Sequence, residues 1–295
     1  MKRHHNASRQ GPDHREGEQV TFLEVKQHFG LGHVRVGSWV SREESLLAAN
    51  LVFDALADLA LILGLPPKAL GLRESLNLAF GHGGREGVMA HYAPQERTLA
   101  LAKNAGAGAL AHEFWHAFDH FIAPKVFDIR AFDSRACDNG GRGHGPHFAS
   151  GLWLRDVPIL SHPLNERLSE LFRITMLSED NQQPSDFVNR AVQLDRGSGY
   201  CYFSRPSELM ARAFEACIES CGSYERLDQD TGELCLLPLV NPYLVTGTQA
   251  KSGARRSGWG TMPDGAFPDE SHRKLIHGAL CCYFHPLGRA LMSRQ

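Results

Sequence analysis

The sequence predicts an α+β fold in which a small sheet lies beside a helix that carries two histidines. Three observations indicate this class. Two short apolar runs, residues 87–93 and 98–103, flank the turn residues 94–97 and suit a pair of strands. A bend rich in Gly and Ala follows, and then a segment with helical periodicity and histidines four positions apart. Far downstream, a second helical segment begins after residue 204 and carries acidic side chains.

The first long element is a helix that ends at Leu63. Ser41-Arg-Glu-Glu44 is a capping box that opens it, and Gly64 with Pro66 and Pro67 stops it. Leucine and phenylalanine recur on every side of this helix between residues 46 and 61. It is too apolar for a surface helix, so we expect it to pack behind the sheet.

The segment from His112 to His116 reads His-Glu-Phe-Trp-His. Residues four apart on an α-helix differ by about 40° around the axis, so both histidines can ligate one metal ion. Glu113 lies about 100° from His112, which is the general-base position of zinc hydrolases. Strands, bend and metal helix in this order are typical of a zincin-like domain. The alternative is an ordinary amphipathic helix whose histidines happen to share a face.

A catalytic zinc site needs three protein ligands and an open fourth position, so a third ligand must come from elsewhere. His120 lies about 12 Å along the axis from His112, beyond the reach of a shared ion. The metzincin pattern requires Gly and His where this chain has Asp119 and Ile122, which excludes that subclass.

The downstream helix offers the better candidates, Glu208 first and Glu215 second. Ser204 and Pro206 are start signals for it. A glutamate on a second helix is how gluzincins complete a His, His, Glu site. The alternative is a solvated charged face in which Glu208 and Arg212 form an i,i+4 pair.

Three runs together resemble a known family. They are residues 87–92, residues 99–120 and residues 202–215, the last containing Tyr, Pro, Ser, Glu and Ala-Arg-Ala-Phe-Glu. They are similar to the predicted zinc-peptidase domain of large phage and plasmid polyvalent proteins. The whole chain looks most like the bacterial CLCA-X family, whose stand-alone members are built on this domain.

The resemblance implies a gluzincin-like metallopeptidase that binds Zn²⁺ and hydrolyses peptide or protein substrates. His112, His116 and Glu208 would be the ligands, with Glu113 as the catalytic base. The spacing from Tyr202 to Glu208 resembles that of lethal-factor-like peptidases, in which the tyrosine stabilises the oxyanion.

One position departs from the pattern. Thermolysin-type enzymes have an aspartate four residues after the ligand glutamate, where this chain has Arg212. Metal-bound imidazoles usually donate their other N–H to a carboxylate or carbonyl, so Asp119 and Glu215 are the candidates for orienting the histidines. We expect all three residues to surround the ligands.

Composition favours one domain. The chain has 295 residues, 42% of them hydrophobic, enough for one large core. We expect a disordered polar tail over residues 1–18 and one zincin-like domain over 19–295. Within it we distinguish an N-terminal helical part (19–75), a metal-site core (76–222) and a C-terminal loop and helix (223–295). Residues 247–271 read as a long loop and the helix as ending near Leu291. The strand ending near Lys103 is our candidate for pairing with an extended peptide.

Charge and cysteine content limit the kinds of partner and the cellular location that we expect. The net charge is −2 and no basic run is dense enough for a nucleic-acid footprint. No stretch approaches the ~20 apolar residues of a membrane helix, so we expect no membrane contact. Seven cysteines without a secretion signal fit a reducing cytoplasm. Cys217 and Cys221 suit a buried core better than a metal site. A second metal site formed by Cys137, His144 and His147 is a weaker interpretation.

Two other functions remain open from the sequence. One is a zinc-dependent binding or regulatory protein that does no proteolysis. The other is a structural site closed by a fourth ligand such as His120 or His147.

Overall fold

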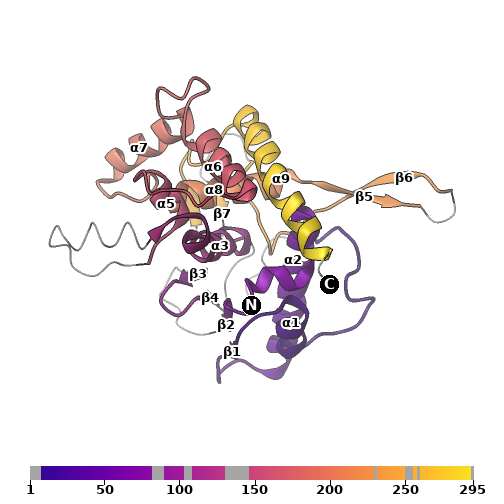
Figure 1. Cartoon of the computed structure of the whole chain (residues 1–295). Helices are drawn as coiled ribbons and strands as arrows, with labels where there is room; N and C mark the ends of the chain where they lie inside the picture. Colours follow the sequence, from indigo (N-terminus) through magenta and orange to yellow (C-terminus); the bar gives the residue numbers. More distant parts are fainter. Residues whose placement is uncertain are drawn as a thin grey trace.

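We describe the chain from a computed structural model. It describes residues 8–81, 90–102, 108–129, 146–228, 231–249, 255–257 and 260–293. These ranges contain eight α-helices, one short 3₁₀ helix and eight strands; Figure 1 shows how they are arranged. The fold is mixed α+β, as predicted, and its main sheet is small.

The main sheet has four strands in the order β1-β2-β4-β3. They are β1 (Val34–Val36), β2 (Asn77–Phe80), β3 (Ala90–Ala93) and β4 (Thr98–Leu101). β1 and β4 run parallel to β2, whereas β3 is antiparallel to β4. The predicted strand pair is therefore confirmed over its described residues; residues 87–89 and 103 lie outside them. β4 lies between two neighbours, so our expectation that this strand receives a peptide is wrong, and the edge strands of the described sheet are β1 and β3.

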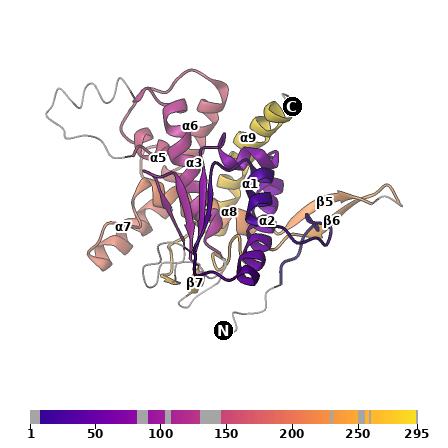
Figure 2. The ribbon, with the colours of Figure 1, turned by 90° about the horizontal axis from the view of Figure 1, so that it is seen from below.

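Two N-terminal helices flank this sheet (Figure 2). α1 (Phe22–Phe29) contacts β1, and its Phe22 ring lies 5.5 Å from the ring of Phe80 on β2. α2 (Arg42–Leu63) begins at the predicted capping box, ends at Gly64 with φ 63°, and contacts α1 and the 3₁₀ helix η1 (Pro67–Gly71).

α2 is long and apolar enough to cross a membrane by length and composition, which our reading of the sequence did not allow for. Of its most apolar window, 67% is buried inside the protein. Asp54 and Asp58 lie within the helix and are themselves buried. Both features are those of a core helix.

The segment from residue 8 to residue 18 contacts α2 instead of forming the expected disordered tail. Arg9 and His14 both contact the Asp58 carboxylate, at 2.7 and 2.8 Å, and Arg15 pairs with Asp54 at 2.9 Å. A carboxylate without solvent needs paired charges and hydrogen bonds, and these residues supply them. Burial raises the pKa of Asp58, but hydrogen bonds from His14, Arg9 and Asn241 and the charge of Arg9 hold it below its usual range.

The second half of the chain is mainly helical. α3 (Leu110–Val126) contacts β3 and β4 and packs on α8 (Pro206–Ser220), which in turn contacts α9 (Glu270–Met292). Around them lie α5 (Ala149–Trp153), α6 (Pro163–Met176) and α7 (Asp186–Ser198). The predicted C-terminal helix is confirmed. One cluster of buried apolar residues extends from Val20 to Phe284 and joins both halves.

Two hairpins were not expected from the sequence. β5 (Ser223–Leu227) pairs with β6 (Leu234–Pro238), and this hairpin projects from the body in Figure 1. β7 (Arg255–Ser257) pairs with β8 (Gly260–Met262) inside the region expected as a loop. Trp259 lies outside the described residues.

Candidate metal centre

A loop that contains Leu244 contacts the N-terminus of α3. The N–H of Ala111 donates to the carbonyl of Leu244 at 3.0 Å, where a helix otherwise has unpaired donors. Just before the helix, Gly108 adopts φ 105° and its N–H donates to Tyr243. A side chain there would meet Thr246 at 2.6 Å, so this approach requires glycine. The loop thereby fixes where the histidine-bearing turn begins.

The structure brings His112, His116 and Glu208 together. The two Nε2 atoms are 3.1 Å apart. Glu208 Oε2 lies 3.3 Å from His112 Nε2, and its Oε1 lies 3.4 Å from His116 Nε2. These ligand atoms all fall within 4.8 Å of one another, and among the described residues they form a group that could hold a metal ion.

Aromatic packing holds the two helices at this separation. The ring of Phe214 on α8 lies 4.9 Å from Trp115 and 6.4 Å from Phe114 on α3, centroid to centroid. Phe114 and Trp115 are the two filler positions of the His-Glu-x-x-His motif. Both aromatic side chains point into the core. The histidines face the side of α8 that carries the glutamates.

Glu215 lies behind His112 and not beside the other ligand atoms. Its Oε1 is 3.0 Å from His112 Nδ1, and both side chains are fully buried. An N–H at Nδ1 that donates to this carboxylate leaves the Nε2 lone pair directed at the cluster. Burial disfavours the charged imidazole, but Glu215 and Glu208 raise the pKa of His112 to about 10.

The donor set fits a tetrahedral divalent metal. Two lone pairs on nitrogen and one carboxylate converge, and such a group needs a cation or a proton between its members. Tetrahedral zinc with bonds of ~2.0–2.2 Å places neighbouring ligand atoms about 3.3–3.6 Å apart. The two Nε2 atoms are 3.1 Å apart, and they lie 3.3 and 3.4 Å from different oxygens of the Glu208 carboxylate, so with one oxygen taken as the ligand all three atoms lie within 4.8 Å of one another. Burial opposes ionisation of Glu208, yet the two imidazoles hold its pKa well below the usual range.

Substituting the two glutamates of α8 should have clearly different effects on the affinity for zinc. We expect Glu208→Ala to abolish tight zinc binding, because one of three ligands is lost. We expect Glu215→Ala to weaken it about 10–100-fold, because His112 loses the group that orients it. Competition against a chromophoric chelator gives both constants. The opposite ranking would transfer the ligand role to Glu215.

Glu113 is buried beside this cluster without being part of it. The side chain is 1% exposed, and its Oε1 has no hydrogen-bond partner among the described residues. Burial raises its pKa, and the nearby histidines lower it again. A buried carboxylate with one oxygen that has no partner among the described residues is placed to accept a proton.

Tyr202 lies on the segment that leads into α8. Burial raises the pKa of its phenol, and the charge of Glu208 raises it further, so the hydroxyl keeps its proton and remains a hydrogen-bond donor. α8 starts at Pro206 with Arg205 as its N-cap, not Ser204. The Ser204 hydroxyl instead donates to Asp195 at 2.5 Å.

Asp195, which sequence reasoning missed, fixes the Tyr202 segment. Its carboxylate accepts the backbone N–H groups of Tyr202, Phe203 and Ser204 at 2.9, 2.7 and 2.8 Å. These bonds lower the pKa of Asp195 although burial opposes them. An aspartate in the last turn of a helix carries no signal in the sequence that separates it from a solvated charge.

Removing the Asp195 carboxylate should therefore loosen Tyr202. We expect Asp195→Ala to lose about 1–3 kcal/mol of unfolding free energy and to retain zinc, since three backbone N–H groups and the Ser204 hydroxyl, all partly buried, lose their acceptor. Peptide hydrolysis should fall more than the loss of folded protein explains. The matched control is Asp186→Ala, an exposed aspartate on the same helix. Equal effects of the two variants would contradict a positioning role for Asp195.

Asp119 and Arg212 hold the segments around the site in place by hydrogen bonds. Asp119 accepts the N–H and the hydroxyl of Ser150 at 2.8 and 2.5 Å, which anchors α5 to α3. Burial raises the pKa of Asp119 to about 6. Arg212 donates to the carbonyls of Ala266 (2.8 Å) and Phe203, which ties two loops to α8. Neither contact is with a ligand histidine, so the orienting role we expected for Asp119 falls to Glu215.

The alternative of a solvated charged face on α8 is wrong. Arg212 and Glu215 are both 0% exposed. The helix is buried on this side because α3 and the loop around residue 266 cover it. Burial lowers the pKa of Arg212, and the negative charges around it oppose that shift.

His120 and His147 do not join the three ligand groups. His120 Nδ1 lies 2.8 Å from the hydroxyl of Tyr92, and both histidines line a separate cavity described below. Cys137 and His144, which we considered for a second metal site, lie outside the described residues.

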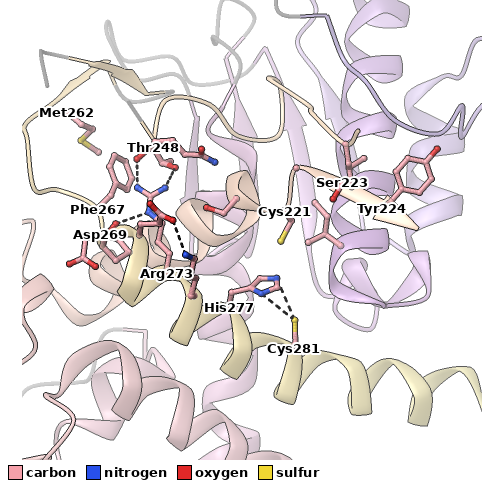
Figure 3. Close-up of a pocket in the computed structure, with 18 of the residues that line it drawn as sticks. Cys221, Ser223, Tyr224, Thr248, Met262, Phe267, Asp269, Arg273, His277 and Cys281 are labelled. Carbon is pink, nitrogen blue, oxygen red and sulfur yellow. Dashed lines mark hydrogen bonds and ion pairs between the residues drawn. The ribbon is translucent and has the colours of Figure 1, made fainter. Parts of the chain in front are cut away.

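A cavity of about 1300 Å³ lies away from the three ligand groups (Figure 3). The end of α8, the base of the β5–β6 hairpin and α9 line it. Its charged groups are largely satisfied: Lys274 pairs with Glu270 at 2.9 Å, and Arg273 donates to Thr248. Burial raises the pKa of the Cys221 thiol to about 12, so it stays protonated.

Fold and site together describe a mixed α+β protein with a candidate metal centre between two helices. A sequence profile of the large polyvalent protein-associated domain 1 matches residues 194–291, about a third of the chain. This match confirms the polyvalent-protein part of the resemblance for α8, the β5–β6 hairpin and α9. It includes Tyr202 and Glu208 but not α3. No curated protein and no solved structure matches the chain.

Proposed function

We propose that the protein is a zinc-dependent peptidase with a gluzincin-like site on a zincin-like domain, as its resemblance to the CLCA-X family implies. The observation that carries this proposal is the convergence of His112 Nε2, His116 Nε2 and the Glu208 carboxylate at separations of 3.1–3.4 Å. Three protein ligands are the number that catalytic zinc sites use.

Each residue around the cluster has a distinct part in the proposed reaction. His112, His116 and Glu208 would hold the ion, which supplies Lewis acidity and lowers the pKa of a coordinated water. Glu113 accepts a proton as the nucleophile attacks the peptide carbonyl and returns it to the leaving amine. The protonated phenol of Tyr202 donates to the oxygen on which negative charge develops.

The edge strand β3 offers the substrate a binding position next to the candidate metal centre. Among the described residues β3 pairs with β4 alone, and a sheet edge can bind an extended peptide by backbone hydrogen bonds. β3 also contacts α3. We infer that a peptide lying along β3 presents its backbone to the turn that holds Glu113.

Two observations favour hydrolysis over the other functions considered from the sequence. A closed structural site needs a fourth ligand, whereas the described residues near the cluster supply three and His120 is engaged with Tyr92. A protein that only binds zinc has no use for Glu113, whose buried oxygen without a partner costs stability.

The experiment that tests this proposal is a digest of a peptide library by wild-type protein and by Glu113→Gln protein, each with measured zinc content. Cleavage that requires both zinc and Glu113 supports it. Zinc-loaded wild-type protein that cleaves no member of the library favours a binding function.

A further inference from the structure

A cavity of about 690 Å³ lies next to the candidate metal centre. One wall comes from β3 and the turn after it, with Tyr92 and Arg97. The opposite wall is the C-terminal half of α3, with His120 and Lys125, and His147 closes one end. The volume is within the usual 300–1,000 Å³ range of ligand pockets, and exceeds that of one side chain.

Two residues connect this cavity to the reaction centre. His120 follows the ligand His116 by one turn of α3, about 6 Å along the axis. Tyr92 belongs to the edge strand, and its hydroxyl lies 2.8 Å from His120 Nδ1. A peptide paired with β3 would therefore place alternate side chains toward this cavity while its backbone passes the ligands.

The charges of the cavity are of one sign. Arg97 and Lys125 line it, and no aspartate or glutamate is among its described lining residues. Lys125 Nζ donates to the carbonyl of Phe121 at 2.8 Å and lies 3.5 Å from the centroid of the Phe121 ring, and it forms no ion pair with a carboxylate of the described residues. The guanidinium of Arg97 makes no ion pair or hydrogen bond with any side chain that the structure describes.

Repulsion between these positive charges lowers pKa values around the cavity. Burial lowers the pKa of Lys125, and the positive charges of Arg73 and Arg97 lower it further. The pKa of His120 is lowered too, first by burial and then by the positive charge of Arg97. A bound anion would relieve this repulsion, and carboxylates form charge-assisted hydrogen bonds with both arginine and lysine.

We propose that this cavity selects substrates with an acidic side chain, which Arg97 and Lys125 bind as a carboxylate while the peptide backbone lies on β3. This inference rests on the proposed peptidase function for its link to cleavage. The occupant is an acidic peptide segment, because the cavity adjoins β3, an edge strand of the described sheet, and is larger than a single carboxylate requires.

The test uses pairs of internally quenched peptides in which each glutamate is replaced in turn by glutamine. For wild-type protein we expect kcat/KM to be about tenfold or more higher for the glutamate peptide at one position, as a charge-assisted contact provides. Arg97→Gln/Lys125→Gln should lose this preference yet still cleave the glutamine peptide. The matched control, Arg226→Gln/Lys274→Gln, removes two exposed charges on the β5–β6 hairpin and α9, and should keep the preference.

Binding separates this inference from the proposed function. Fluorescence anisotropy of the same peptides with Glu113→Gln protein needs no hydrolysis. Selective binding of the glutamate peptide that depends on Arg97 and Lys125, without cleavage by wild type, supports the acidic cavity and overturns the peptidase. Cleavage with no glutamate preference overturns the acidic cavity alone. Inorganic phosphate that binds as tightly as the glutamate peptide also overturns it, because the site is then a simple anion site.

Discussion

Glu113→Gln protein is expected to bind zinc as wild type does and to hydrolyse peptides about a hundredfold more slowly or worse. Glutamine keeps the size of the side chain but cannot accept the proton. His112, His116 and Glu208 are untouched, so the affinity for zinc should not change. Because the Glu113 carboxylate is buried with one oxygen unpartnered, the neutral amide should be no less stable toward thermal unfolding.

Three measurements check this expectation: zinc content by mass spectrometry, the melting temperature, and the rate of peptide cleavage at saturating zinc. Glu166→Gln, on the exposed face of α6, is the matched control and should behave as wild type. Cleavage by Glu113→Gln at the wild-type rate would show that another group takes the proton.

The second large effect concerns the metal itself. Wild-type protein should carry about one zinc ion per chain, and His112→Ala/His116→Ala protein should carry none, because one carboxylate cannot hold the ion alone. His120→Ala removes the next histidine of α3, which contacts Tyr92 instead, and should keep full occupancy. Stoichiometric zinc in the folded double variant, with folding checked by circular dichroism, would contradict the ligand assignment.

Local patterns predicted the helices and strands that bear the chemistry. Four-residue spacing put His112 and His116 on one face, and the structure has their Nε2 atoms 3.1 Å apart. The capping box at Ser41 and the stop at Gly64 gave the bounds of α2. These features depend on neighbours within a few residues, so the sequence carries them directly.

What the sequence did not reveal depends on partners far along the chain. Asp58 and Asp195 look like ordinary helix charges, yet one anchors the N-terminal segment and the other holds the segment of Tyr202. Strands β1 and β2 were missed because three or four residues are too few to show a period. Polar composition suggested disorder for residues 1–18, although Arg15 and His14 in the described part of this segment contact buried acids on α2.

The separation along the chain between the partners of the metal centre affects how it assembles. His112 meets Glu208 and Glu215 across 96 and 103 residues. The loop that closes α3 is held through Asn241, which donates to Asp58 across 183 residues at 2.8 Å. Contacts this distant form late, since chain-closure entropy must be overcome first.

An ion bound at this site, as we propose, would therefore join the fold late, in contrast to small zinc domains that are unfolded without their metal. During synthesis both histidines leave the ribosome well before either glutamate of α8. The proposed set of ligands is complete only when the second half of the chain has been made.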